Sequence, residues 1–231
     1  MQGQSQPDRV RQVLSDLESL RENLLALSDD IWLSIDHNDQ QELEEGFEFK
    51  RAYNEKLNAF DQIAEEISGL IQRFTAVELE PEVADQPVEQ QREERERTIR
   101  ELDRSEPHNL HENFTYKRPF GYTLHETAHK DVVTWKRLYQ LVCRQLASYD
   151  LELFRSLPER PEFVSSRGNL AFSYRPDGFL SPIDIGHGVY AEAHMSANSI
   201  CDRIGELLTV FGIDHDDIKI YLREDRDART D

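Results

Sequence analysis

Cysteine is scarce in this sequence. Only 2 of the 231 residues are cysteines, Cys143 and Cys201, and each stands beside apolar positions of a predicted helix. Two isolated thiols do not make the disulfide framework that stabilises small secreted domains. We therefore expect two reduced thiols in a protein core, with a disulfide or a reactive thiol as the alternatives.

Long apolar runs are missing as well. The sequence has no stretch of about 18 apolar residues, so no membrane-spanning helix is predicted. Its first ten residues, MQGQSQPDRV, lack the basic start and the apolar core of a signal peptide. The expected location is therefore cytoplasmic, with no membrane as a partner.

Lysine is rare among the charged residues. It supplies 6 of the 27 basic residues, against 46 acidic ones, and the net charge is −19. Residues 1–116 hold 12 basic and 28 acidic residues, whereas residues 117–224 hold 13 and 15. Many carboxylates with few lysines suit a salt-rich cytoplasm, where screening is strong. The composition indicates a halophilic host, with an ordinary acidic protein as the alternative.

The N-terminal part, residues 1–75, is predicted to be a helical hairpin. Residues 8 to about 36 carry apolar side chains in heptad steps, Val13, Leu17, Leu20, Leu24, Leu27 and Ile31. The turn-prone residues 36–39 interrupt this pattern, and Asn38 or Asp39 can cap the helix that follows. A second apolar pattern then runs to about Phe74. Two long helices with a tight connection form an antiparallel, coiled-coil-like pair.

A pair of helices alone buries little apolar surface. We therefore expect the hairpin to associate with another copy of the chain or with a larger protein partner. The alternative is that it folds back onto its own C-terminal half. The residues predicted to mediate oligomerisation are Leu17, Leu20, Leu24, Leu27, Ile31, Leu57, Phe60 and Ile67.

Residues 76–116 are predicted to be an acidic linker. They are rich in Pro, Glu and Gln and have no apolar period until a short charged helix that begins near Pro87 and ends near Arg104. Residues 105–116 are expected to be loop.

Residues 117–224 are predicted to form a compact α+β domain of order β-β-α-α-β-β-α-β, followed by a tail at 225–231. The clearest part is residues 188–222, which are predicted to form a strand, a helix and a strand. Ser196 is placed to cap that helix, and Gly212 to end it in a left-handed conformation. The final strand, 218–222, alternates apolar and polar residues.

Four segments of this domain carry a resemblance: KRPFGYTL, VVTWKRLYQLVCRQL, SPIDIGHGVYAEAHMSANSI and LLTVFGIDHDDIKIYL. Together they resemble a small α+β module of uncharacterised prokaryotic proteins that are associated with restriction, phage-defence or mobile-element genes. The matching positions are mostly architectural: Trp135, Tyr190, Ser196, Asn198, Phe211 and Gly212. The resemblance covers less than half of the chain and implies a genetic setting rather than a chemistry.

The sequence His125-Glu126-Thr127-Ala128-His129 fits the H-E-x-x-H motif. On a helix, the two histidines would share one face and bind zinc, with Glu126 as general base. The resemblance instead puts the motif in a strand–turn–strand, where this spacing does not bring the rings together. A zinc metallohydrolase is therefore kept only as an alternative, and no catalytic, cofactor-binding or metal-ligating residue is assigned.

The most basic and aromatic part of the domain is residues 155–175. Arginine can pair with phosphates, and an aromatic face can stack on a base. The candidate recognition surface consists of Arg155, Arg160, Arg167, Phe172, Tyr174 and Arg175. A DNA-binding component would use these residues. In the other interpretation, which we favour, the aromatics belong to the core and the arginines pair with Glu159, Glu162 and Asp177.

The sequence thus predicts a non-enzymatic accessory or regulatory subunit. It would oligomerise through its hairpin and recognise a partner through its α+β domain, in a prokaryotic defence or mobile-element system. Nucleic acid is a disfavoured partner, because the phosphate attraction would meet a net charge of −16 on residues 1–116. No cofactor is expected.

Overall fold

The computed structural model describes residues 5–77, 88–166 and 168–227. It is a mixed α+β structure with two long N-terminal helices and small antiparallel sheets in the C-terminal part, which confirms the predicted fold class. The chain divides into two compact units, Met1–Ala84 and Asp85–Asp231. None of the helices in the described ranges is long and apolar enough to cross a membrane.

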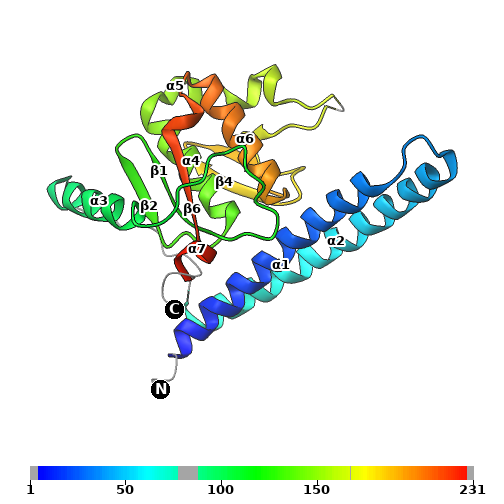
Figure 1. Ribbon diagram of the computed structural model, residues 1–231, viewed down its shortest axis with the longest axis horizontal. Coiled ribbons are helices and arrows are strands. Elements are labelled where there is room, and N and C mark those ends of the chain that lie inside the picture. The colour runs from blue at the N-terminus through cyan, green and yellow to red at the C-terminus, as the bar shows by residue number, and fades with distance from the viewer. Residues whose placement is uncertain (1–4, 78–87, 167, 228–231) are drawn as a thin grey trace. The chain divides into compact units, whose positions relative to one another are not determined.

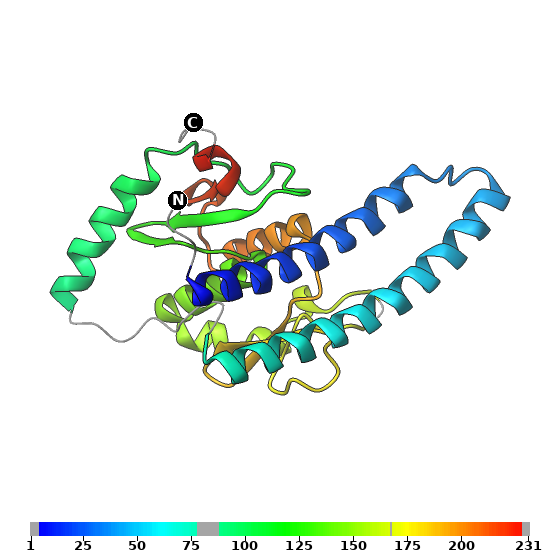
Figure 2. The same cartoon turned by 90° about the horizontal axis from the view of Figure 1, so that it is seen from below.

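The first unit is a hairpin of two helices, α1 (Gln6–Ser34) and α2 (Gln40–Thr75) (Figures 1 and 2). Both helices begin at a side-chain cap. The Ser5 hydroxyl accepts from the Asp8 amide, and the Asp39 carboxylate accepts from the Gln41 and Glu42 amides. These caps satisfy amides that have no partner within the helix. The turn-prone residues at 36–39 therefore end one helix and begin the next.

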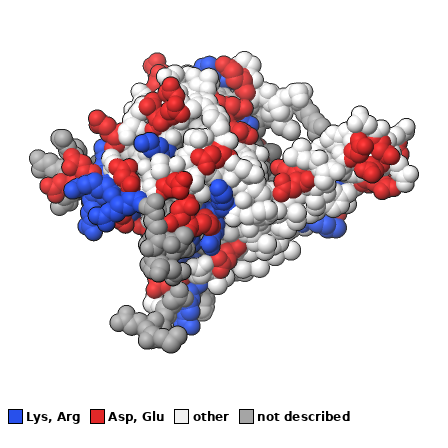
Figure 3. All heavy atoms as spheres, viewed as in Figure 1, with Lys and Arg blue, Asp and Glu red and all other residues white. Residues whose placement is uncertain are grey.

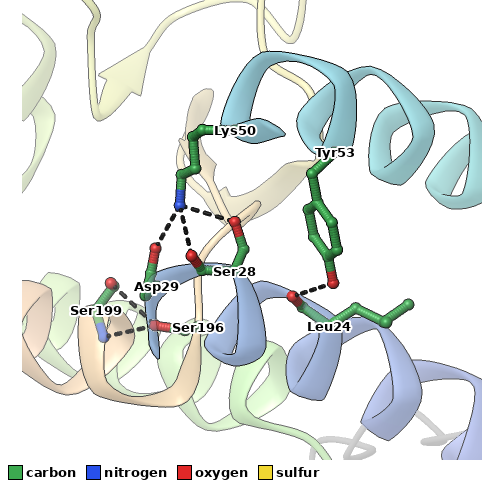
Figure 4. A network of polar contacts seen from close by, with 7 residues as sticks. All are labelled: Leu24, Ser28, Asp29, Lys50, Tyr53, Ser196 and Ser199. Atoms are coloured by element: carbon green, nitrogen blue, oxygen red, sulfur yellow. Dashed lines mark hydrogen bonds and ion pairs between the residues drawn. The ribbon is translucent and has the colours of Figure 1, made fainter. Parts of the chain in front are cut away.

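Polar side chains fix the register of the two helices. The Lys50 ammonium donates to the Ser28 hydroxyl at 2.8 Å and to the Asp29 carboxylate at 3.0 Å (Figure 4). Further along α2, the Tyr53 hydroxyl donates to the Leu24 carbonyl at 2.9 Å. Positions on α1 decrease as positions on α2 increase, so the helices run antiparallel, as predicted.

The second unit contains the remaining elements in the order α3 (Val88–Leu102), β1 (Pro119–Leu124), β2 (Thr127–Lys130), α4 (Trp135–Tyr149), α5 (Leu151–Arg155), β3 (Phe172–Ser173), β4 (Pro182–Gly186), β5 (Val189–Glu192), α6 (Ala197–Val210), β6 (Ile218–Leu222) and α7 (Arg223–Asp227). Short 3-10 turns lie at η1 (Leu157–Glu159), η2 (Pro161–Phe163) and η3 (His215–Asp217). The predicted order of strands and helices is present. The structure adds the two-residue strand β3 and the short helix α7, both too short for an apolar period to reveal them.

The strands form two antiparallel sheets, with the orders β2-β1-β6 and β3-β5-β4. Strand β1 pairs on both sides, with Tyr122 opposite His129 of β2 and Ile220 of β6. All six of its residues are buried. Helix α4 packs against β1, β4 and α6, so it joins the two sheets in one core.

Side-chain caps begin α4 and α6 in this unit, the second of them as predicted. The Thr134 hydroxyl accepts from the Arg137 amide at the start of α4, and the Ser196 hydroxyl accepts from the Ser199 amide at the start of α6 (Figure 4). Gly212 has a φ of +68°, the left-handed conformation expected after α6. Cys143 and Cys201 are both buried and unpaired. Burial raises the pKa of each thiol, because it disfavours the charged thiolate.

Helix α3 adds a small second core. Leu102 is fully buried and, with the partly buried Ile99, packs against Phe120, Ala128 and Tyr221. The Lys130 ammonium also donates to Glu101 at 2.7 Å. The end of the stretch that we expected to be linker is therefore attached to the β2-β1-β6 sheet.

The packing around Gly121 leaves no room for a side chain. A Cβ at this position would overlap the backbone oxygen of His129 and would lie 3.0 Å from a Leu102 methyl group. We expect Gly121→Ala to destabilise the second unit by about 1–3 kcal/mol, because backbone cannot move aside without disturbing the β1–β2 pairing. Chemical denaturation, monitored by Trp135 fluorescence in a Trp32→Phe background, measures the free energy of unfolding of the second unit alone.

Gly69 provides the control, because a Cβ there would have no neighbour within 4 Å. Because Gly69 lies in the first unit, Gly69→Ala should leave the Trp135 transition unchanged, although it should stabilise α2 itself by about 0.5–1 kcal/mol. Equal stability of Gly121→Ala and the parent protein would mean that β1 and β2 do not pair in the register described.

Candidate functional site

The hairpin exposes large apolar side chains at heptad spacing on both helices. They are between 38% and 93% exposed, and we call them the hairpin face: Val13, Leu20 and Leu27 on α1, with Ile63, Ile67, Leu70 and Phe74 on α2. Steps of seven on α1, and of four, three and four on α2, are those of a coiled-coil seam. Solvated apolar residues in such a pattern are typical of a surface that another helix covers.

Both stripes lie on the same side of the hairpin. On α1, Leu27 directly precedes Ser28, which accepts from Lys50 of α2. On α2, Ile63 directly precedes Ala64, which lies one heptad after the buried Leu57. One residue along a helix is a rotation of about 100°. In an antiparallel pair, the residue that directly precedes a contact position points to the same side of the pair on both helices. The stripes of α1 and α2 therefore form one surface.

The structure divides the eight residues predicted to mediate oligomerisation. Leu20, Leu27 and Ile67 are exposed and belong to the hairpin face. The others are half-buried or, like Leu57, buried: Leu17, Leu24, Ile31, Leu57 and Phe60. A heptad repeat has two apolar positions, and the sequence does not tell which of them faces the partner helix within the hairpin. The other members of the hairpin face were not among the eight predicted residues: Val13, Ile63, Leu70 and Phe74.

The candidate recognition surface is smaller than predicted. Phe172 is only 1% exposed and packs edge-to-face on Phe163, with ring centroids 4.8 Å apart, so it must be removed from this surface. Its position on β3, facing the core, explains its burial. Arg160 pairs with Glu162 at 2.9 Å, as the competing interpretation requires. Arg167 lies outside the described residues.

The remaining members, Arg155, Tyr174 and Arg175, are exposed. The Tyr174 hydroxyl is held at 2.9 Å from the Glu159 carboxylate and at 3.1 Å from the Arg155 carbonyl. Its ring is therefore fixed to the loop that follows α5.

The H-E-x-x-H sequence lies on a strand–turn–strand, as expected. His125 is in the turn between β1 and β2, with a φ of +50°, and its ring is 3.2 Å from the Asp217 carboxylate. His129 is on β2 and stacks on Tyr122, with centroids 5.1 Å apart. The two rings thus have separate partners, and the helical geometry of a zinc protease is not formed. Within the described ranges, no group of three or more His, Cys, Asp or Glu side chains is arranged to hold a metal ion.

Three other histidines, which belong to none of the predicted motifs, lie in polar clusters. His108 is 9% exposed, and its backbone pairs with Ile220 of β6. Its Nδ1 lies 2.7 Å from Glu112, and its Nε2 lies 2.8 Å from Asp225 of α7. Burial alone would lower the pKa of His108, but the hydrogen bonds to Glu112 and Asp225 outweigh it and raise the pKa above the usual 6.5. The ring donates from both nitrogens only in its charged form.

The other two, His111 and His215, come from positions 104 residues apart and meet at a cleft. The cleft has a volume of about 410 Å³, and its lining includes Asp202 and Glu206 of α6. No local sequence signal could have joined these residues.

Comparisons with known proteins give no relative. No protein-family model matches the chain, and no similar curated protein or solved structure was found. The resemblance to modules of defence or mobile-element systems therefore stays a prediction.

His108 gives the second unit a pH dependence. Because its pKa is raised on folding, its contribution to stability is complete below the unfolded value of about 6.5 and is lost as the pH rises through the folded value. We expect the free energy of unfolding of the parent to fall more steeply above about pH 6.5 than that of His108→Gln. Denaturant titrations over this range measure the difference, and His187→Asn, at an exposed turn position, should match the parent.

His129 should act in the opposite direction. Burial, together with the positive charges of Arg137 and Arg95, lowers the pKa of His129 to about 4. Below about pH 6.5, His129 becomes protonated in the unfolded chain but stays neutral in the folded protein. Stability is therefore lost as the pH falls. His129→Gln should remove up to roughly 3 kcal/mol of the loss between about pH 6.5 and 4. An unchanged acid slope in this variant would contradict the assigned environment.

Proposed function

We propose that the protein is a non-enzymatic assembly subunit whose hairpin pairs with the hairpin of a second copy. The two hairpins would form a four-helix bundle, and the α+β unit would carry partner recognition. The observation that supports this proposal is the hairpin face. Its seven large apolar side chains are exposed to solvent and are not covered by the residues that the structure describes.

The hairpin face is large enough to matter energetically. Seven such side chains expose several hundred Å² of apolar surface, on the order of what each partner buries in a standard protein interface. At about 25 cal/mol per Å², burying this surface in both copies gains on the order of 20–30 kcal/mol before the costs of association. In the view of Figure 3, much of the hairpin between its turn and its open end is likewise free of charged side chains.

A second copy fits this surface because a two-fold interface presents the same patch from both sides. The heptad stripes are complementary to each other, since apolar knobs at these steps fill holes between residues of the same spacing. No charged side chain interrupts either stripe to specify a different partner.

Charge selects the relative direction of the two hairpins. Six carboxylates and no lysine or arginine lie between positions 36 and 48: Asp36, Asp39, Glu42, Glu44, Glu45 and Glu48. These acidic residues gather at the turn end, which is red in Figure 3. A parallel pairing would bring both acidic ends together, whereas an antiparallel pairing separates them by about 50 Å, the length of the helices. We therefore propose the antiparallel arrangement.

Recognition of a further partner would use the second unit. Arg155, Tyr174 and Arg175 remain exposed there, while the burial of Phe172 weakens the DNA-binding alternative, which needs aromatic faces. A cytoplasmic location, a halophilic host and a role in a defence or mobile-element system belong to the same proposal and rest on composition and on the resemblance.

The test is the mass of the full chain in solution. The parent protein should elute in light-scattering chromatography as a dimer of about 54 kDa, twice the 27.0 kDa of the chain. Ile63→Glu should raise the dissociation constant by at least about 100-fold, because each dimer would bury two unpaired carboxylates. Gln62→Glu adds the same charge one residue away, outside the hairpin face, and should leave the dimer intact.

Helical content by circular dichroism should be equal in the parent protein and both variants, which separates loss of assembly from loss of folding. A parent protein that is monomeric at all concentrations and salt strengths would overturn the proposal, as would equal dissociation of the two Glu variants.

A further inference from the structure

The cleft between the loop that precedes β1 and helix α6 holds two imidazole rings edge to edge. His111 Nε2 lies 3.4 Å from His215 Nδ1. The ring centroids are 5.3 Å apart and the planes are inclined by 32°. Because the nitrogens are closer than the centroids, the ring edges, rather than the faces, are turned toward each other.

His215 is fixed with its Nδ1 lone pair directed into this gap. The Thr209 hydroxyl donates its hydrogen to the Gly205 carbonyl at 3.0 Å, so its oxygen is left to accept from His215 Nε2, also at 3.0 Å. A neutral imidazole that carries its hydrogen on Nε2 has a free lone pair on Nδ1. The ring also rests on α6 where a Cβ at Gly205 would lie only 3.2 Å from it.

The loop that carries His111 is held in place as well. The Asn109 side chain accepts from the His111 amide at 2.9 Å. Two residues further on, the Asn198 side chain of α6 donates to Asn113 at 3.1 Å and accepts from the Phe114 amide at 2.7 Å. The His215 ring and the backbone that carries His111 are therefore held in place by groups other than the two imidazoles.

The separation of the two nitrogens suits a metal ion better than a hydrogen bond. N–H donors usually lie 2.7–3.2 Å from their acceptors, so a distance of 3.4 Å is long. Two nitrogens bound at about 2.0–2.1 Å to one tetrahedral ion lie about 3.3–3.4 Å apart. We propose that His111 Nε2 and His215 Nδ1 bind a divalent transition metal of the zinc class.

The same cleft provides a third ligand and access for water. Asp202 lines it and is exposed, and its side chain forms no hydrogen bond or ion pair with any residue that the structure describes. Glu206 also lines the cleft but pairs with Arg203 at 2.9 Å. No three-residue metal group is already assembled among the described residues, so Asp202 would have to turn toward the ion on binding, and water would complete the shell. Two imidazoles and a carboxylate form a donor set that zinc accepts.

The experiment is calorimetric titration of zinc chloride into the untagged, chelator-treated full chain. We expect one zinc per chain. His111→Gln and His215→Gln should each weaken binding by at least about tenfold, and Asp202→Asn should weaken it less. His129→Gln removes a histidine of the H-E-x-x-H sequence and should bind zinc like the parent.

Two further variants test the role of Thr209 as a positioning residue. Thr209→Val removes the acceptor for His215 Nε2 and should weaken zinc binding about tenfold, whereas Thr209→Ser retains the hydroxyl and should restore it. If His215→Gln does not fold, His111→Gln decides, because His111 is exposed on its loop. Absence of zinc binding by the parent, unchanged binding by His111→Gln, or an equal loss in His129→Gln would overturn the proposal. The titration is independent of assembly, since Ile63→Glu should bind zinc with the parent's affinity.

Discussion

Pairing of β1 on both of its edges is the constraint on which the second unit depends. Its six residues are all buried, so its backbone groups must be satisfied by β2 and β6 rather than by water. The pairing with β6 brings residues from the end of the chain next to those that precede β1. It thereby places His108 beside Asp225 and His111 beside His215. Both polar clusters thus follow from one strand pairing that closes a loop of about a hundred residues.

The hairpin is subject to a different constraint, the geometry of two helices. Each helix can bury only the side that faces the other, while its apolar pattern is wider than that side. Lys50 and Tyr53 fix the register with polar contacts to α1. The apolar positions next to this line of contact, such as Leu27 and Ile63, are left in solvent. The two-helix packing of the first unit cannot cover these apolar residues, and they are the residues through which we propose that the chain assembles.

Local features were predictable from the sequence, whereas meetings between distant segments were not. The caps at Asp39, Thr134 and Ser196 depend on side chains that bond to amides two or three residues away, so the sequence alone shows them. The side of the hairpin that faces solvent depends on helix rotation, which a heptad repeat leaves open. The burial of Phe172 depends on the pairing of β3 with β5, and a two-residue strand has no period to detect. The His111–His215 pair has no local signal at all, because its members come from opposite ends of the unit.

Gly205 makes the choice of residue at position 215 depend on the residue at position 205. A glycine in the middle of a helix costs about 0.5–1 kcal/mol relative to alanine, and here it lies in the buried part of α6. Because Gly205 has no side chain, the His215 ring can pack directly against α6 at this position. In a diverging sequence, a larger residue at 205 would have to be accompanied by the loss or displacement of the imidazole at 215. Positions 205 and 215 should therefore change together, and drift in this cleft would proceed through paired substitutions instead of single ones.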